Sequence, residues 1–484
     1  MKKFFKTFLI FFFVLSFSFS GLIGCGGSGG KTRIIVDGGG AAGNFNTTPS
    51  MTPSEANPRP YNTLEKLAEK WEETHPEYDI VIQRQSANGN RDVLTGWLSA
   101  GTAPDIIFQN PSILAEDLGK GWYVNLTEWL EKPNPYNDDK PWKELYNERE
   151  LETTRGPDGE FYYITLEKFP IGIMYNKDLF VKAGLDPESP PKTYGEFMAA
   201  QEALSKVEGV LAPYFPQFNW YNIVLETSIF GGDIAKLDTV RENSIIDTEE
   251  FCKAYTEGLW SPSDPKFTTF AQVATDKAKY YPDDYQTYVM ATEFFNGKVG
   301  MMEVNGQRMT QVLEDGNRTF DVGLFGYPLL GENDPGYSGY GVIRGVSGLS
   351  TAWWVTNSAE KKGTTEAAID FLMYLTSPEQ NTPLINDLGL TLPLDPDCEV
   401  SEFYQPLVDV YKEDFSNPKM LTWGAFNSIG KMNKEYADTW HRTLTSSIDG
   451  YKTVAEFVEI MEAAAADAYD KLMKTNGWTA DRWG

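Results

Sequence analysis

A cysteine directly follows an apolar stretch near the start of the chain, which places a nucleophilic thiol where lipid could be attached. Residues 20–31 read SGLIGCGGSGGK, so Cys25 stands among glycines in a chain of 484 residues that has only three cysteines. Lys2, Lys3 and Lys6 precede an almost wholly apolar run at residues 8–19. A basic head followed by such a run is typical of an export signal. The run is shorter than the roughly 20 residues that cross a bilayer, which favours its removal.

Residues 22–25 (LIGC) resemble the lipobox of bacterial lipoproteins, in which the cysteine thiol takes a diacylglycerol before cleavage makes it the new N-terminus. Two acyl chains suffice for stable anchoring, whereas one gives only marginal binding. The resemblance implies a signal peptide at residues 1–24, a lipidated Cys25 and a flexible tether at residues 25–30. The protein would then be extracytoplasmic and anchored to the outer face of the bacterial cell membrane. An uncleaved membrane helix is the alternative.

The charge of the chain limits the partners that it can attract. The formal net charge is -27 at pH 7, and removal of residues 1–24 with their three lysines leaves 460 residues with a charge near -30. Such a surface repels nucleic acid and anionic lipid. The expected partners are therefore neutral or cationic, and the membrane is contacted only through the lipid anchor. The remaining length is enough for two or three domains with sizeable cores.

Metal, thiol and nucleotide chemistry have little support in the sequence. His75 and His441 are the only histidines, and neither has a companion at metal-ligand spacing. Cys252 and Cys398 could form a disulfide in an exported protein, although Cys252 also fits ordinary packing. Residues 37–43 (DGGGAAG) formally match GxGxxG, but the proline-rich segment after them does not open the helix that a dinucleotide site needs. We expect no cofactor and no metal.

Strands and helices alternate in the part of the chain that must position a site. Residues 32–36 and 106–108 are short apolar runs typical of buried strands, and a third strand is predicted around Ile80 and Ile82. Helices are predicted from Asn62, with Glu65 as its capping partner, and over residues 91–100. This order predicts an α/β fold with a parallel sheet covered on both faces. Further helix starts are predicted at Thr193, Asp247, Ser377 and Thr453.

Several segments resemble, in order, successive parts of the extracellular solute-binding proteins (family 1 type) that serve carbohydrate ABC transporters. They are GTAPDIIFQNPSILAEDLGKGWYVNLTEWLE, IGIMYNKDLFVKAGLDPESPPKTYGEFMAAQEAL, EFFNGKVGMMEVNG, and AAIDFLMYLTSPEQ followed by TLPLDPD. The second is the most specific, through YNKDLF at residues 175–180. The resemblance covers nearly the whole chain beyond the tether. It implies a two-lobed periplasmic-binding-protein-like fold of type II, with a ligand cleft between lobes joined by a hinge.

The resemblance also implies how the two lobes divide the chain. Lobe one would comprise residues 31–166 and 322–378, and lobe two would comprise residues 167–321 and 379–484. The chain would cross between the lobes near residues 166–169, near Asp321 and near Pro378. A proline-rich insertion at residues 45–60 departs from the family pattern and could shape one rim of the cleft.

A saccharide needs flat rings against its C–H face and directional partners for its hydroxyls. Aromatic residues make up 14% of the chain, and the resemblance points to Trp353 and Trp423 as stacking candidates. Trp220 is a third candidate, because it lies in the aromatic and proline-rich segment PYFPQFNWYN. Trp353 is followed by Trp354 in a predicted strand, so at most one of the two can face a ligand. Each of these tryptophans could instead belong to the core or to the rim.

The polar candidates lie mostly where strands end, because open α/β sheets bind ligands at their carboxyl edge. Asn110 precedes Pro111 and could equally cap a helix. Glu167 lies at the expected crossing between the lobes. The candidates are Asn44, Asn88, Gln109, Asn110, Glu167, Asn305, Gln307 and Arg308.

The resemblance implies a carrier, expected to be a monomer, that closes around a sugar and delivers it to ABC transporter permease subunits. Sugar bridging both lobes would favour the closed form by its differential affinity. The length of the chain and its many rings favour an oligosaccharide. Two alternatives are a passive carbohydrate-binding adhesin and a surface glycoside hydrolase, which needs two carboxylates about 5–9.5 Å apart. The 69 acidic residues leave room for such a pair, but the quoted segments include no catalytic signature.

Overall fold

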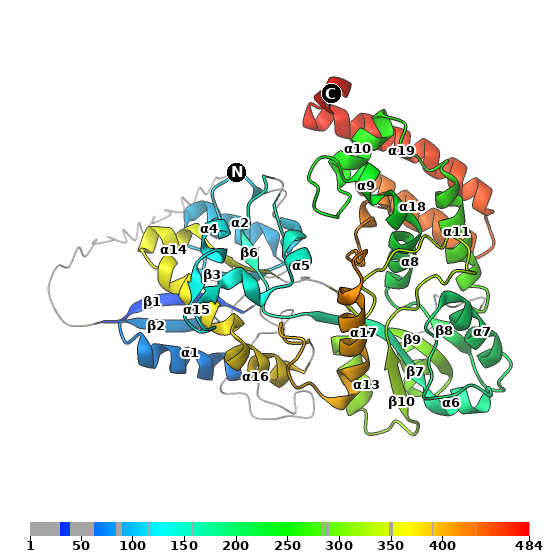
Figure 1. The fold of residues 1–484 in the computed structure, drawn as a ribbon, viewed down its shortest axis with the longest axis horizontal. Helices are drawn as coiled ribbons and strands as arrows, with labels where there is room; N and C mark the ends of the chain where they lie inside the picture. Colours follow the sequence, from blue (N-terminus) through cyan, green and yellow to red (C-terminus); the bar gives the residue numbers. More distant parts are fainter. Residues whose placement is uncertain are drawn as a thin grey trace, which may run out of the picture.

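Two lobes lie side by side in the computed structural model, each built on its own sheet (Figure 1). The structure describes residues 30–38, 62–83, 90–113, 117–156, 158–282, 285, 290–347, 352–389, 391–430 and 432–483. Cys25, Asn44, Asn88 and the insertion at residues 45–60 lie outside these ranges, as do the predicted signal peptide and the tether up to residue 29. Within the described ranges, no helix combines the length and the apolar character needed to cross a membrane.

Lobe one is built on a five-stranded sheet with the order β2-β1-β3-β12-β6. The three strands predicted from the N-terminal part of the chain form its parallel half, in which β1 pairs with β2 and with β3. β12 continues the sheet antiparallel to both β3 and β6. The strands are β1 (Thr32–Asp37), β2 (Tyr78–Gln83), β3 (Ile106–Gln109), β6 (Tyr163–Ile164) and β12 (Ala352–Val355).

Amphipathic helices cover this sheet. α1 buries Leu64, Leu67, Ala68 and Trp71, as its spacing predicts. The predicted capping role of Asn62 is wrong, because its side chain makes no capping hydrogen bond. The helices of lobe one are α1 (Thr63–Thr74), α2 (Arg91–Ala100), α4 (Thr127–Leu130), α5 (Glu148–Glu152), α14 (Asn357–Lys362), α15 (Thr365–Thr376) and α16 (Pro378–Leu388), with 3-10 turns η2 (Pro111–Ile113) and η3 (Trp142–Leu145) and the small pair β4 (Pro133–Asn134) and β5 (Lys140–Pro141).

Lobe two is built on a second sheet with the order β10-β7-β9-β8, and β11 also pairs with β7. The long central β7 is antiparallel to β10, β11 and β9, whereas β8 runs parallel to β9. Seven of the eight residues of β7 are buried, which agrees with its continuous apolar sequence. The strands are β7 (Phe169–Asn176), β8 (Ala212–Phe215), β9 (Val299–Asn305), β10 (Val322–Phe325) and β11 (Val346–Ser347).

A large group of helices surrounds the second sheet and extends beyond it, with α10, α11, α18 and α19 together at the upper right of Figure 1. The predicted helix starts at Thr193, Asp247 and Thr453 are confirmed, and each of them forms a capping box at the start of α7, α10 or α19. The start predicted at Ser377 is confirmed too, although its side chain makes no capping hydrogen bond. The helices are α6 (Lys177–Lys182), α7 (Tyr194–Leu204), α8 (Trp220–Phe230), α9 (Ile234–Leu237), α10 (Thr248–Thr256), α11 (Pro265–Lys277), α12 (Met290–Phe295), α13 (Gly306–Glu314), α17 (Gln405–Ser416), α18 (Lys434–Ile448) and α19 (Val454–Asn476), with 3-10 turns η4 (Gly231–Asp233), η6 (Glu402–Tyr404), η7 (Asn427–Gly430) and η8 (Ala480–Trp483).

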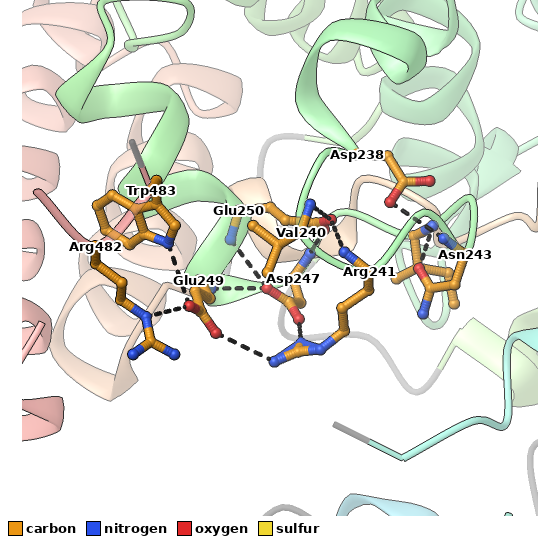
Figure 2. Close-up of polar contacts among 10 residues, drawn as sticks. Asp238, Val240, Arg241, Asn243, Asp247, Glu249, Glu250, Arg482 and Trp483 are labelled. Carbon is orange, nitrogen blue, oxygen red and sulfur yellow. Dashed lines mark hydrogen bonds and ion pairs between the residues drawn. The ribbon is translucent and has the colours of Figure 1, made fainter. Parts of the chain in front are cut away.

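The start of α10 also anchors the C-terminal turn (Figure 2). Asp247 accepts hydrogen bonds from the backbone N–H groups of Glu249 and Glu250 at 2.7 and 3.0 Å, and the Glu250 carboxylate accepts from the N–H of Asp247 at 3.0 Å. Arg482 Nε and Trp483 Nε1 donate to the Glu249 carboxylate at 2.7 and 3.2 Å. The first turn of α10 therefore holds the C-terminal turn η8 against the rest of lobe two.

The chain crosses between the two sheets three times. It passes from β6 to β7 through residues 165–168, as predicted, then from β11 to β12, and last between α16 and η6. The backbone N–H groups of Lys168 and Leu392 donate to each other's carbonyl oxygens at 2.8 Å, which joins the first and third crossings. These paired segments form the hinge.

The observed division differs from the predicted one in two places. Residues 322–347 were assigned to lobe one, but β10 and β11 pair with β7 in lobe two. α16 was assigned to lobe two, but its Leu384 and Ile385 belong to the core of lobe one. The chain therefore does not cross at Asp321 or at Pro378.

Candidate functional site

Four partly exposed aromatic rings gather in lobe two beside the first crossing. Trp220 is the first residue of α8, and its ring lies 6.2 Å from the ring of Trp423 in an edge-to-face arrangement. Phe218 stacks on Trp220 at 4.3 Å, and Phe169, which directly follows the crossing, lies 6.1 Å from Trp220. We call Phe169, Phe218, Trp220 and Trp423 the aromatic cluster. The structure thus brings together two of the three predicted tryptophans, and their partly exposed rings can meet the apolar face of a ligand.

A buried carboxylate fixes the segment that carries Phe218 and Trp220. The Glu303 carboxylate, from β9, accepts hydrogen bonds from the backbone N–H groups of Phe218 and Tyr221, each at 2.8 Å. Between them, Asn219 has a φ of 56°, a left-handed conformation that is uncommon for a residue with a side chain. Glu303 therefore helps to hold a sharp turn that presents Trp220 at the surface.

Charge balance behind this turn comes from a buried lysine. Burial raises the pKa of Glu303, and the nearby Lys277 ammonium and the backbone donors partly oppose that rise. Burial lowers the pKa of Lys277 to about 8. The Lys277 Nζ also lies 5.2 and 5.4 Å from the ring centres of Tyr214 and Tyr221. Sequence reasoning missed Glu303, although a single acid within the apolar strand VGMMEVN is a signal of a buried polar role.

A polar group lies at the start of α13. Asn305 caps this helix, because its Oδ1 accepts from the backbone N–H of Arg308 at 2.9 Å. The Arg308 guanidinium donates to Gln311 at 2.8 Å, and to the Gln217 side-chain oxygen at 3.0 and 3.3 Å when that amide is turned toward it. Gln307 is exposed. Gln217 lies next to Phe218, so this group adds directional donors near the aromatic cluster.

The candidates in lobe one have other environments. Gln109 is buried at the end of β3, and its side-chain oxygen accepts from the backbone N–H of Asn110 at 3.0 Å. Asn110 itself is exposed at the start of the 3-10 turn η2. The structure places Trp353 in the core, where it is 0% exposed and packs edge-on against Phe108. Trp354 is also 0% exposed. The two side chains belong to separate hydrophobic clusters on opposite faces of β12, so both faces of this strand are covered.

Glu167 lies in the hinge and has an unusual environment. Its side chain is 1% exposed, and among the described residues no side chain hydrogen-bonds to either carboxyl oxygen. Burial raises its pKa to about 8. A carboxyl group in such a place is neutral at lower pH, and it can bind a hydroxyl that reaches it.

In the part of the chain that the structure describes, the fold brings together no group of side chains suited to metal binding or to disulfide formation. Among the described residues, no three His, Cys, Asp or Glu side chains come together as metal ligands. Cys252 and Cys398 are both free thiols, and burial raises the pKa of Cys252 to about 12 and that of Cys398 to about 11.

Two α/β lobes, three chain crossings and an aromatic cluster beside the hinge define a two-lobed periplasmic-binding-protein-like molecule of type II. The model of the bacterial extracellular solute-binding proteins matches residues 66–422, so the chain belongs to this family.

Known proteins extend this comparison. The sn-glycerol-3-phosphate-binding periplasmic protein UgpB of Yersinia pestis bv. Antiqua is 28% identical over 213 residues, which cover 43% of each chain. The match thus spans less than half the length of this relative. Two solved structures share the fold at 16% identity, with coverage of 91% of this chain and 100% of theirs. They are a family 1 extracellular solute-binding protein from Bifidobacterium longum subsp. infantis (TM-score 0.61) and the cyclic alpha-maltosyl-1,6-maltose binding protein from Arthrobacter globiformis (TM-score 0.60).

Proposed function

We propose that the protein captures an oligosaccharide between its lobes by hinge closure and delivers it unchanged to the permease of an ABC transporter. The observation that carries the proposal is the aromatic cluster, in which the partly exposed rings of Trp220 and Trp423 lie 6.2 Å apart beside the hinge. Arg308 and Gln217 supply donors and acceptors for hydroxyl groups nearby. Rings for C–H faces and fixed polar groups for hydroxyls together match the two surfaces of a sugar.

The proposal includes the place of the protein in the cell. A lipidated Cys25 would hold it as a monomer on the outer face of the cell membrane, with residues 26–30 as a tether. The family to which the chain belongs is extracellular, which agrees with an exported chain. Capture and release need no covalent step, so the proposed carrier is not an enzyme.

A panel of sugars tests the proposed ligand class. The panel contains maltodextrins, xylo-, manno- and chito-oligosaccharides and cyclic maltosyl-maltose. We expect one of these series to raise the unfolding temperature of the purified protein. A ligand at 100 times its dissociation constant adds about 2.7 kcal/mol to the free energy of unfolding. Differential scanning fluorimetry measures the shift, and chromatography of the recovered ligand measures any turnover.

The other outcomes of this panel are equally informative. If only sn-glycerol 3-phosphate stabilises the protein, the ligand is the one named for the Yersinia relative and not a sugar. Arg308 would then be the candidate phosphate partner. Hydrolysed ligand would identify a glycoside hydrolase. Binding without compaction in small-angle scattering would identify an adhesin.

Trp423→Ala is expected to weaken the binding of the saccharide that stabilises the wild-type protein by roughly 30-fold or more. Central aromatic residues of a binding site typically contribute about 2 kcal/mol or more, which is a factor of roughly 30 in affinity. Isothermal titration calorimetry measures the change. Trp478→Ala is the matched control, because Trp478 is also partly exposed but packs against Trp483 near the C-terminus. Equal affinities of Trp423→Ala and Trp478→Ala would remove Trp423 from the site.

A further inference from the structure

A pocket of about 230 Å³ lies between α8 and α18 in lobe two. α8 supplies Asn222 and Glu226, α18 supplies Trp440, His441 and Thr445, and Phe270 of α11 lies at the same pocket. Its size exceeds the roughly 30 Å³ of one water molecule several times, and it is somewhat smaller than the roughly 300–1,000 Å³ of a drug-sized site. The pocket therefore suits one ring-sized group rather than a whole oligosaccharide.

The pocket contains a buried acceptor that needs a donor. Asn222 is 7% exposed, and no described residue donates to its Oδ1. The Glu226 carboxylate follows one helical turn later on the same side of α8 and is also buried. Buried acceptors are nearly always hydrogen-bonded in folded proteins. A ligand hydroxyl that enters the pocket can satisfy Asn222 Oδ1.

The pocket also has aromatic walls, of which Trp440 is 6% and Phe270 is 1% exposed. Trp440 and Phe270 lie parallel to within 22° with their ring centres 5.5 Å apart, and both line the pocket. Asn222 and Glu226 add acceptors for ligand hydroxyls, whereas Arg308 beside the aromatic cluster offers donors. A purely apolar group would leave Asn222 unsatisfied, and an anion would meet the carboxylate of Glu226.

The pocket is continuous with the candidate site, because Phe218 and Trp220 line it and also belong to the aromatic cluster. A chain of linked sugar rings can thus pass from the surface of Trp220 into the pocket without leaving aromatic surface. We propose that this pocket receives one terminal unit of an oligosaccharide whose neighbouring units lie against Trp220 and Trp423. This inference rests on the proposed function, and it assigns a length preference to the same site.

The experiment fills the pocket and compares ligands of different length. The purified Thr445→Trp variant is titrated calorimetrically with the longest and the shortest member of the saccharide series that stabilises the wild-type protein. We expect at least tenfold weaker binding of the longest member and unchanged binding of the shortest. Arg442→Trp is the matched control, since Arg442 is exposed on the same helix and does not line the pocket. It should leave both affinities unchanged.

A second variant removes the acceptor without filling the pocket. Asn222→Leu keeps a similar side-chain size, and we expect it to weaken the binding of only the longer saccharides. The unfolding temperature of this variant shows whether it folds. Unchanged affinity for the longest member in both variants would overturn the pocket assignment and leave the sugar-binding proposal intact. Equal loss for all lengths would assign the pocket to the main subsite instead. Absence of binding by the wild-type protein to every sugar would overturn the proposed function and this inference with it.

Discussion

Lys168→Met is expected to lower the free energy of unfolding by about 3–5 kcal/mol, because it leaves a buried carboxylate without its cation. Lys168 lies in the first crossing, and its Nζ forms an ion pair with Glu150 of α5. The two side chains are only 6% and 1% exposed. Breaking such a buried pair costs far more than breaking a pair in water.

The same cluster joins the two lobes. Tyr411, from α17 of lobe two, donates to the Glu150 carboxylate at 2.8 Å, and Lys168 Nζ also bonds to the Tyr411 hydroxyl. Glu150 belongs to lobe one, so the three side chains connect both lobes at the hinge itself. Any rotation of the lobes must keep or exchange these contacts.

Denaturant unfolding measures the effect, and a double variant separates charge from packing. Lys168→Met with Glu150→Gln should recover most of the lost stability, because no uncompensated charge stays buried. Lys412→Met is the matched control, since Lys412 also pairs with a carboxylate, that of Asp397, but the pair is largely exposed. Its effect should be too small to resolve. A Lys168→Met midpoint equal to that of the wild-type protein would contradict the cost of the buried pair.

Local patterns predicted much of the fold. The capping boxes at Thr193, Asp247 and Thr453 and the apolar strands were readable because each depends on residues close in sequence. The lobe division was less accurate. β10 pairs with β7, more than 140 positions earlier in the chain, and a four-residue strand carries no local sign of its partner. Similarly, α16 reads as an ordinary helix, and only its packing on α1 and α15 places it in lobe one.

The aromatic cluster of the candidate site was predictable in part for the same reason. Trp220 and Trp423 lie in aromatic or polar segments outside strands, and both have partly exposed rings. Strand alternation predicted that one of Trp353 and Trp354 packs in the core, but both do, because β12 is covered on both faces. Glu303 was missed, since its role depends on a turn that the sequence places 82 to 85 residues away. Such support becomes visible only when distant segments are brought together.

Glu167→Gln is expected to stabilise the protein increasingly as the pH rises from about 4.5 to about 8. Burial raises the pKa of Glu167 to about 8 in the folded protein, whereas the ordinary value near 4.5 applies to the unfolded chain. Between these values the folded state holds a proton that the unfolded state has lost. The stability of the wild-type protein therefore falls as the pH rises through this window. At roughly 1.4 kcal/mol per pKa unit, the loss amounts to at most about 5 kcal/mol.

Glutamine keeps the size of this side chain and removes its titration, so the difference in unfolding free energy between variant and wild type isolates Glu167. Glu250 and Asp414 also have raised pKa values, to about 8 and about 7, but they titrate in both proteins and cancel in the difference. Glu202→Gln provides a control of opposite sign, because Lys206 lowers the pKa of Glu202. Its variant should lose only a little stability relative to wild type as the pH rises, because both side chains of this pair are exposed and the pair is screened by water. If the difference in unfolding free energy between Glu167→Gln and wild type does not depend on pH, then solvent or a cation reaches this carboxyl group. The hinge would then be more open than the 1% exposure of Glu167 indicates.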